Sequence, residues 1–328
     1  MRVFITGSAG FVGANLCSVL SRSGKFKIVG ADDFNDYYDV RLKRARTKFL
    51  TPDVTHHELD ISDADALADL VRQIQPDVVI HLAAQAGVRH SFVKPMNYAR
   101  ANLSGHVSVL EAVRRAGSVR RFIYASSSSV YSGVTQLPFT ETTKLGTPKS
   151  LYAASKIADE ILTDTYSNLF GLDAIGLRFF TVYGPWGRPD MAYWSFAESI
   201  LSGREIKLFN FGDVRRDFTY IDDITRAIEN MVDEVSDGAP EPQHRLYNIG
   251  NHSPEPVRRL ISILEGFFQT EANVSLAPLP PGDMVETYAC VDRLRADYGF
   301  APETTLEDGL TKFVTWFDEW RKGEKYKV

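Results

Sequence analysis

The sequence predicts a doubly wound α/β fold, in which helices cover both faces of a parallel sheet. Short apolar runs alternate with helical patterns five times in the first 180 residues, and strands that alternate with helices in this way form parallel sheets. A glycine-rich turn joins the first apolar run to the first helical pattern. Beyond about residue 180 the alternation weakens, which predicts a smaller, mixed α/β domain.

The length and composition allow two domains. With 328 residues and 44% hydrophobic residues, the chain can form one large or two ordinary domains with a real core. We expect residues 1–180, joined by segment 217–250, to form the first domain. The rest of residues 181–328 is expected to form the smaller, discontinuous one.

Charge and cysteine content exclude several classes of protein. The net charge is −5 without a basic block, which argues against a nucleic-acid partner. No apolar run is long enough for a membrane span. Cys17 and Cys290 lie far apart without metal-like spacing, which is typical of proteins in a reducing compartment. A strand is expected from residue 3 onward, so we expect no signal peptide in this sequence. We therefore expect a cytoplasmic protein without a metal site.

The first strand, residues 3–6, leads into Gly7-Ser8-Ala9-Gly10-Phe11-Val12-Gly13 and then a helical pattern to about Ser23. Glycines let the backbone approach a pyrophosphate, and a helix N-terminus offers free N–H groups with a positive dipole end. The spacing is G-x-x-G-x-x-G. This strand, turn and helix predict a dinucleotide site.

The second strand, residues 26–31, ends in Asp32-Asp33, 25 residues after the first glycine. An acid at this place can accept hydrogen bonds from both ribose hydroxyls of NAD, and it repels a 2′-phosphate. The sequence therefore favours NAD over NADP.

The next elements bring more polar residues to the same sheet edge. Helices are expected over residues 39–50, 64–75 and 97–117, the last of which carries Asn102. Asp60 either caps the second of these helices or faces the adenine. A buried strand over residues 77–84 ends in small residues, over which a cofactor ribose can lie. His81 within it is expected to be a packed strand residue.

The strand at residues 122–125 leads into four serines, 126–129, and Val130-Tyr131 indicates that they form a buried ledge. The helix expected over residues 151–170 follows. Of the 14 tyrosines only Tyr152 has a lysine four residues later, Lys156, so the two share one helix face about 6 Å apart. An ammonium near a phenol stabilises the phenolate, which suits proton removal from an alcohol. An isolated pair of this kind is usually a surface pair, so the prediction depends on its surroundings.

The second half is expected to cap the carboxyl edge of the sheet. A strand over residues 172–180 is followed by an aromatic segment rich in glycine and proline, 181–192. Beyond it we expect strands over 206–209 and 245–249 and helices over 191–203, 222–235, 255–268 and 305–322.

Together these motifs resemble the extended short-chain dehydrogenase/reductase family over essentially the whole chain. Within it, segments 35–39, 85–89 and 179–192 are similar to those of UDP-glucuronate 4-epimerases. The resemblance implies a Rossmann-like domain with tightly bound NAD. It also implies a homodimer, in which helices 97–117 and 151–170 pair with their copies as a four-helix bundle.

The resemblance further implies roles for single residues. Tyr152 would exchange the sugar O4 proton, Ser127 would hydrogen-bond O4, and Lys156 would bind the nicotinamide ribose. Cofactor contacts are implied for Gly7, Gly10, Phe11, Val12, Gly13, Asp32, Asn35, Asp60, Ile61, Leu82, Ala83, Ala84, Asn102, Tyr152, Lys156 and Phe180. Substrate contacts are implied for Ser127, Ser128, Ser129, Thr181, Arg188, Phe209, Arg216, Asp283 and Arg89. Two positions depart from the subgroup: Ser132 replaces a glycine and Cys290 an aspartate.

The implied reaction is 4-epimerisation of a UDP-sugar, UDP-glucuronate to UDP-galacturonate, by oxidation at C4, rotation of the 4-keto sugar and re-reduction. A buried carboxylate requires partners, for which Ser128, Ser129 and Arg188 are candidates, with Arg89 next. The alternatives are a UDP-glucose or N-acetylhexosamine 4-epimerase, a UDP-glucuronate decarboxylase and an NAD-sensing module without turnover. The serines stand where lyases of the family carry an acid, so elimination lacks its catalyst. A sensing module would not need both Tyr152 and Lys156.

Overall fold

A seven-stranded parallel sheet runs through the computed structural model, which describes residues 1–235, 243–323 and 325–326. Its strands, in spatial order, are β10 (His244–Ile249), β6 (Ala174–Phe179), β5 (Arg121–Ser127), β4 (Val78–His81), β1 (Arg2–Thr6), β2 (Lys27–Asp32) and β3 (Thr55–Glu58). The order reverses between β1 and β4, and such a reversal leaves a crevice for a ligand at the carboxyl ends of the strands. The predicted doubly wound parallel sheet is confirmed.

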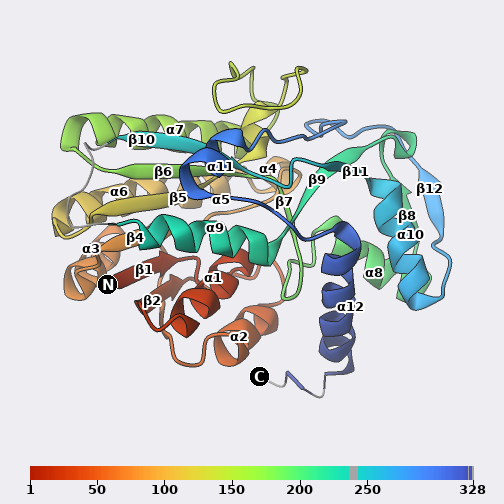
Figure 1. Ribbon diagram of the computed structural model, residues 1–328, viewed down its shortest axis with the longest axis horizontal. Helices are drawn as coiled ribbons and strands as arrows, with labels where there is room; N and C mark the ends of the chain where they lie inside the picture. The colour runs from red at the N-terminus through yellow and green to blue at the C-terminus, as the bar shows by residue number, and fades with distance from the viewer. Residues whose placement is uncertain (236–242, 324, 327–328) are drawn as a thin grey trace.

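Helices cover both faces of this sheet (Figure 1). Side chains alternate along β1: Phe4 packs in one apolar cluster, whereas Val3 and Ile5 pack in the other. The helices beside the first cluster are α3 (Ala64–Ile74), α6 (Gly105–Ala116) and α7 (Leu151–Phe170). Those beside the second include α1 (Phe11–Arg22), α2 (Val40–Phe49) and α9 (Ile221–Asp233). Because successive apolar side chains of a strand point to opposite faces of the sheet, each face is covered by its own apolar cluster.

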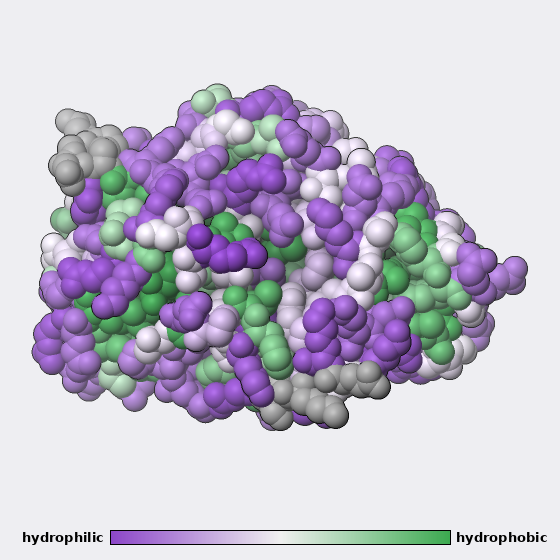
Figure 2. All heavy atoms as spheres, turned by 60° about the horizontal axis from the view of Figure 1, so that its bottom comes forward, coloured by the Kyte–Doolittle hydropathy of each residue, from purple (hydrophilic) through white to green (hydrophobic). Residues whose placement is uncertain are grey.

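Two smaller sheets lie at the right of Figure 1. One contains β11 (Pro254–Pro256), β9 (Arg215–Tyr220) and β7 (Thr181–Tyr183), and the other contains β12 (Val274–Leu276) and β8 (Ile206–Leu208). The helices of this half are α8 (Ala192–Ser202), α10 (Val257–Phe268) and α12 (Leu306–Lys322), whereas α11 (Asp292–Tyr298) packs against β10 and α9. Apolar side chains gather on the surface at the end of the molecule formed by α10 and β12 (Figure 2). The smaller mixed α/β part that the sequence predicted is therefore present.

The described residues of segment 217–250 belong to both parts. Its strand β9 lies in the three-stranded sheet, whereas α9 packs against α1 and β10 pairs with β6 in the large sheet. The division into two domains at residue 180 stays a prediction. None of the helices in the described ranges combines the length and the apolar character that a bilayer span requires.

Two predicted elements need correction near the crevice. The helix expected over residues 97–117 is instead α5 (Pro95–Tyr98), a π-helical turn η1 (Ala99–Ser104) and α6, preceded by the short α4 (His90–Val93). The strand expected over residues 77–84 ends at His81. The reason is that β1 ends at Thr6, whose carbonyl accepts the N–H of Leu82 at 3.1 Å, so the next residues have no strand to pair with. Residues 82–84 therefore turn out of the sheet and line the crevice.

Candidate active site and cofactor cleft

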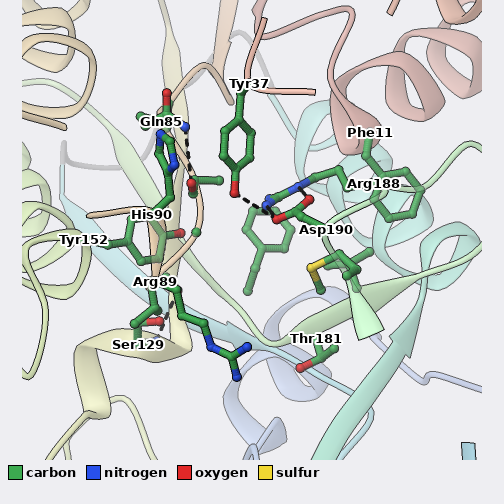
Figure 3. A pocket seen from close by; sticks show the side chains of 18 of the residues that line it. Phe11, Tyr37, Gln85, Arg89, His90, Ser129, Tyr152, Thr181, Arg188 and Asp190 are labelled. Atoms are coloured by element: carbon green, nitrogen blue, oxygen red, sulfur yellow. Dashed lines mark hydrogen bonds and ion pairs between the residues drawn. The ribbon is translucent and has the colours of Figure 1, made fainter. Parts of the chain in front are cut away.

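The carboxyl ends of the central strands open into a cleft of ≈ 1230 Å³. Every residue predicted for the cofactor or the substrate, apart from Asn102, lines this cleft. Figure 3 looks into it, and side chains from distant segments, among them Tyr37, Arg89, Tyr152 and Arg188, point toward one space. The fold therefore brings together residues that lie far apart in the sequence.

The glycine turn forms one end of the cleft. The N–H of Gly7 donates to Ala31 O at 2.8 Å. Gly7 has φ +72°, and a Cβ there would lie 2.6 Å from the backbone nitrogen of Ala83, while a Cβ at Gly13 would collide with Gly7 O. Helix α1 begins at Phe11 without a side-chain cap. Its free N–H groups and positive dipole end are thus available to a pyrophosphate.

Asp32 is held rigidly at the end of β2. Its carboxylate accepts hydrogen bonds from Ala9 N at 3.1 Å and Phe34 N at 2.9 Å, and the residue is only 6% exposed. Burial raises the pKa of Asp32, and Lys43, whose Nζ lies 3.7 Å away, opposes that rise. The sequence pattern gives no sign that this lysine is buried. A fixed carboxylate that still lines the cleft suits recognition of ribose hydroxyls.

Asp60 lies in the cleft wall and does not cap a helix. The cap of α3 is Asp63, whose side chain accepts from Ala66 N at 3.1 Å. Asp60 accepts from Ser62 N at 2.9 Å and lies 3.4 Å from Arg100. Of the two alternatives for Asp60, capping is therefore excluded.

The predicted proton-transfer residues lie where β5 meets α7. Ser150 caps α7 by accepting from Ala153 N at 3.1 Å, and the helix places Tyr152 and Lys156 along the cleft. The ammonium of Lys156 donates to Ala125 O at 3.0 Å, although the residue is only 3% exposed. The pair is therefore not the surface pair that its spacing alone would suggest.

The serine run forms the ledge that the sequence predicted. Ser127 Oγ accepts from Ser129 N at 3.1 Å, which begins the 3₁₀ turn η2 (Ser128–Tyr131). Below the ledge, Ser126 Oγ donates to Glu160 at 2.6 Å, and Arg178 binds the same carboxylate through both Nε (2.8 Å) and Nη2 (2.7 Å). A buried ion pair thus supports the serines from behind.

Asn102 lies behind the cleft wall. Its amide accepts from Gln85 N at 2.8 Å and donates to Gln85 O at 3.1 Å and to Ser155 Oγ at 2.9 Å. The side chain, carried by the π-helical turn, therefore ties the segment after β4 to helix α7. Any effect of Asn102 on the cofactor acts through these neighbours.

The far end of the cleft is cationic and aromatic. Arg89 Nη2 lies 2.8 Å from Asp283, and its guanidinium lies 4.3 Å from the centroid of the Phe209 ring. Arg216 lies 4.0 Å from the same aspartate. These residues come from four separate segments, and together they offer planar donors and a stacking surface to a nucleoside diphosphate.

Arg188 does not stand alone in the cleft wall. Its Nε donates to Asp190 at 3.0 Å, and Nη2 forms an ion pair with the same carboxylate at 2.5 Å (Figure 3). Tyr37 Oη also donates to Asp190, at 3.1 Å, and the Tyr37 ring lies 4.7 Å from that of His90. Asp190 was not predicted, because an aspartate in a glycine- and proline-rich loop is usually solvated.

Arg46 is a further residue of the site that the sequence did not reveal. It is fully buried and donates to Ala9 O in the glycine turn and to Trp186 O and Gly187 O in the loop before Arg188. It thereby ties the cofactor end of the cleft to the loop of Arg188. The run Lys43-Arg44-Ala45-Arg46 reads as an exposed helix face, so no local signal identifies it.

The two departures from the subgroup pattern have local structural roles. Ser132 is buried, and its Oγ accepts from Lys149 N at 3.1 Å. Cys290 donates its N–H to Phe139 O at 2.9 Å, and burial raises the pKa of its thiol. Ser132 thus ties the end of η2 to the segment before α7. The bond of Cys290 is made by its backbone, so it does not depend on the cysteine side chain, whose Sγ donates to Asp292 at 3.4 Å.

The NAD dependent epimerase/dehydratase family matches residues 3–250. The chain belongs to this family. The matched residues include the glycine turn, the serine ledge and the Tyr152–Lys156 pair, all of which line the cleft. The family membership agrees with the resemblance found in the sequence.

Individual relatives cover nearly the whole chain. UDP-glucuronate 4-epimerase 4 of Arabidopsis thaliana is 43% identical over 98% of this chain and 76% of its own length. Protein CapI of Staphylococcus aureus is 42% identical over 98% of this chain and 100% of its own. The crystal structure of UDP-glucuronic acid 4-epimerase from Bacillus cereus, in complex with UDP-glucuronic acid and NAD, has a TM-score of 0.90 at 31% identity, covering 98% of this chain and 100% of that one.

Proposed function

We propose that this protein is a UDP-glucuronate 4-epimerase that holds NAD tightly and forms UDP-galacturonate. The observation that carries the proposal is that Tyr152, Lys156 and the serine ledge line one cleft with the dinucleotide turn and the two far arginines. Two similar proteins that carry the name UDP-glucuronate 4-epimerase, one from Arabidopsis thaliana and one from Bacillus cereus, support the same reaction. Production of UDP-galacturonate from UDP-glucuronate, without added cofactor, tests it.

The residues of the cleft fit NAD. The glycine turn leaves no room for a Cβ, α1 has no side-chain cap, and Asp32 is pinned where a ribose is expected. When bound, NAD supplies the oxidation of the sugar at C4 and its reversal. The same carboxylate repels a 2′-phosphate, so we propose a preference for NAD over NADP.

The protein's own part in the reaction is proton transfer and orientation. Tyr152, as tyrosinate, takes the O4 proton and later returns it, while Ser127 hydrogen-bonds the same oxygen. The ammonium of Lys156 stabilises the negative charge on the tyrosinate. Arg216 and Arg89 hold the diphosphate, and Phe209 packs on the uracil. This anchoring leaves the sugar free to turn between the two proton transfers.

Arg188→Ala is expected to weaken UDP-glucuronate binding by roughly 1.5–3 kcal/mol, the usual loss for a hydrogen bond to a charged group. The ion pair with Asp190 uses Nε and Nη2 of Arg188. The proposal assigns a remaining N–H of the guanidinium to the substrate carboxylate. UDP-glucose has no carboxylate, so its binding should change little. Titration calorimetry with both nucleotides compares the two losses, and equal losses would assign Arg188 to the shared nucleotide or to the fold.

We also propose that the protein is a homodimer through a four-helix bundle of α6 and α7 with their copies. The two helices pack side by side, and α7 carries the exposed apolar residues Ile161 (61% exposed) and Leu169 (68%). An apolar surface of this kind favours a partner helix. Light scattering at micromolar concentration should give twice the chain mass of 36.7 kDa, and a monomer mass would refute the dimer.

A cytoplasmic location is part of the same proposal. Cys17 and Cys290 are both free thiols in the structure, and Cys17 is buried. Free thiols are typical of reducing compartments.

A further inference from the structure

The ammonium of Lys156 is held from behind the cleft by two protein oxygens. Its Nζ donates to Ala125 O and to Asp159 Oδ2, each at 3.0 Å. Asp159, one turn further along α7, is completely buried. An ammonium has three N–H donors. The two bonds therefore leave one donor for a ligand in the cleft, which Lys156 lines.

Burying Asp159 in its ionised form costs free energy of folding. Asp159 Oδ1 is buried and has no hydrogen-bond partner among the described residues. Burial raises the pKa of Asp159 from 3.8 to about 6, although Lys156 opposes the rise. Because the folded-state pKa is raised, the group favours folding below pH 3.8, and that contribution is lost as the pH rises through about 6. The contact with Lys156 therefore offsets only part of the cost of burying this carboxylate.

Apart from Lys156, none of the titratable groups described around Asp159 is positively charged at neutral pH. They are His81 on β4, His106 on α6, Tyr124 on β5 and Glu160 on α7. Burial lowers the pKa of both histidines and raises that of the tyrosine, so all three are neutral at pH 7. The glutamate is itself anionic and is bound by Arg178. Among the described residues Lys156 is therefore the cation that the Asp159 carboxylate contacts.

We propose that Asp159 is a positioning residue, whose carboxylate holds the Lys156 ammonium so that the third N–H faces the cofactor. The inference rests on the proposed function, because it assigns Lys156 to the cofactor. The carboxylate also compensates a cation that would otherwise be buried without a counter-charge, which proteins strongly disfavour. Asp159 thus fixes the lysine on the helix face that carries Tyr152.

Two variants separate the geometry of this contact from its charge. Asp159→Asn keeps an acceptor oxygen for the ammonium, whereas Asp159→Ala removes both acceptor and charge. For the purified holoenzyme, the rate of NAD dissociation and Tm are measured for each. We expect Asp159→Ala to release NAD at least roughly 10-fold faster at neutral pH, the effect of losing one hydrogen bond to a charged group. In the rate of NAD dissociation, Asp159→Asn should lie between Asp159→Ala and the wild type.

The pH dependence distinguishes positioning from a general structural effect. Asp159 takes up a proton as the pH falls through about 6. Below that pH, NAD dissociation from the wild type should approach that from Asp159→Asn, whose own rate should change little. A matched control is Asp173→Asn, which breaks a buried ion pair with Arg121 (2.8 Å) at the opposite end of the sheet strands. It should lower Tm and leave NAD dissociation unchanged.

Wild-type rates of NAD dissociation in both Asp159 variants would overturn the proposal. Equally fast NAD dissociation from Asp173→Asn would also overturn it, because faster release would then result from a general loss of stability. Neither measurement uses a sugar substrate. The role of Asp159 is therefore decided separately from whether the wild type converts UDP-glucuronate.

Discussion

Tyr152→Phe should retain the fold and the bound NAD and lose at least ~100-fold in turnover, the usual scale for removing an acid/base group. In the proposed mechanism the phenol oxygen is the proton acceptor, and Ser127 and Lys156 line the same cleft. Its removal leaves the ring in place, including the edge-to-face contact with Tyr98 at 6.1 Å. Turnover is measured at saturating UDP-glucuronate, and NAD content by absorbance after denaturation.

Tyr166→Phe is the matched control on the same helix. Its hydroxyl donates to Glu111 on α6 at 2.8 Å, outside the cleft. Turnover of this variant should equal that of the wild type. Near-normal turnover in Tyr152→Phe would remove Tyr152 from the mechanism.

Arg178→Met is expected to destabilise the protein by about 3–5 kcal/mol, the usual loss when one partner of a buried ion pair is removed. Arg178 is 3% exposed, and both its Nε and its Nη2 bind Glu160. Without the guanidinium, Glu160 remains buried as an uncompensated charge beneath Ser126. The free energy of unfolding is measured by urea denaturation.

Arg44→Met provides the exposed counterpart. Arg44 pairs with Glu58 at 2.7 Å, but both side chains are largely exposed, so the same substitution should cost only about 0–1 kcal/mol. The double variant Arg178→Met/Glu160→Met should recover much of the loss, because it leaves no unpaired charge. A loss below about 1 kcal/mol in Arg178→Met would show that the ledge does not depend on this pair.

Local patterns were sufficient for the features that depend on local chemistry. The alternation of apolar runs predicted the parallel sheet, and the glycine spacing predicted a turn in which Gly7 and Gly13 leave no room for a Cβ. The spacing of Tyr152 and Lys156 predicted one helix face. These signals can be seen in the sequence because each pattern is formed by residues a few positions apart.

The supporting contacts could not be predicted, because they join segments that are distant in sequence. Arg46 binds carbonyls 140 and 141 residues away, and its position in a basic run gives no sign of burial. Asp159 follows Lys156 by one turn, so an i, i+3 ion pair could have been noted. Its burial depends on the strands behind α7, which helical periodicity does not reveal. The pattern of apolar residues likewise did not predict the π-helical turn around Asn102.

The most direct test of the proposed function is incubation of the purified protein, without added NAD, with UDP-glucuronate and separately with UDP-glucose, read by proton NMR of the sugar. The residues of the cleft predict that UDP-glucuronate is converted to UDP-galacturonate and that UDP-glucose remains essentially unchanged. Epimerisation of UDP-glucose with UDP-glucuronate untouched, or release of a UDP-pentose from UDP-glucuronate, would contradict the account.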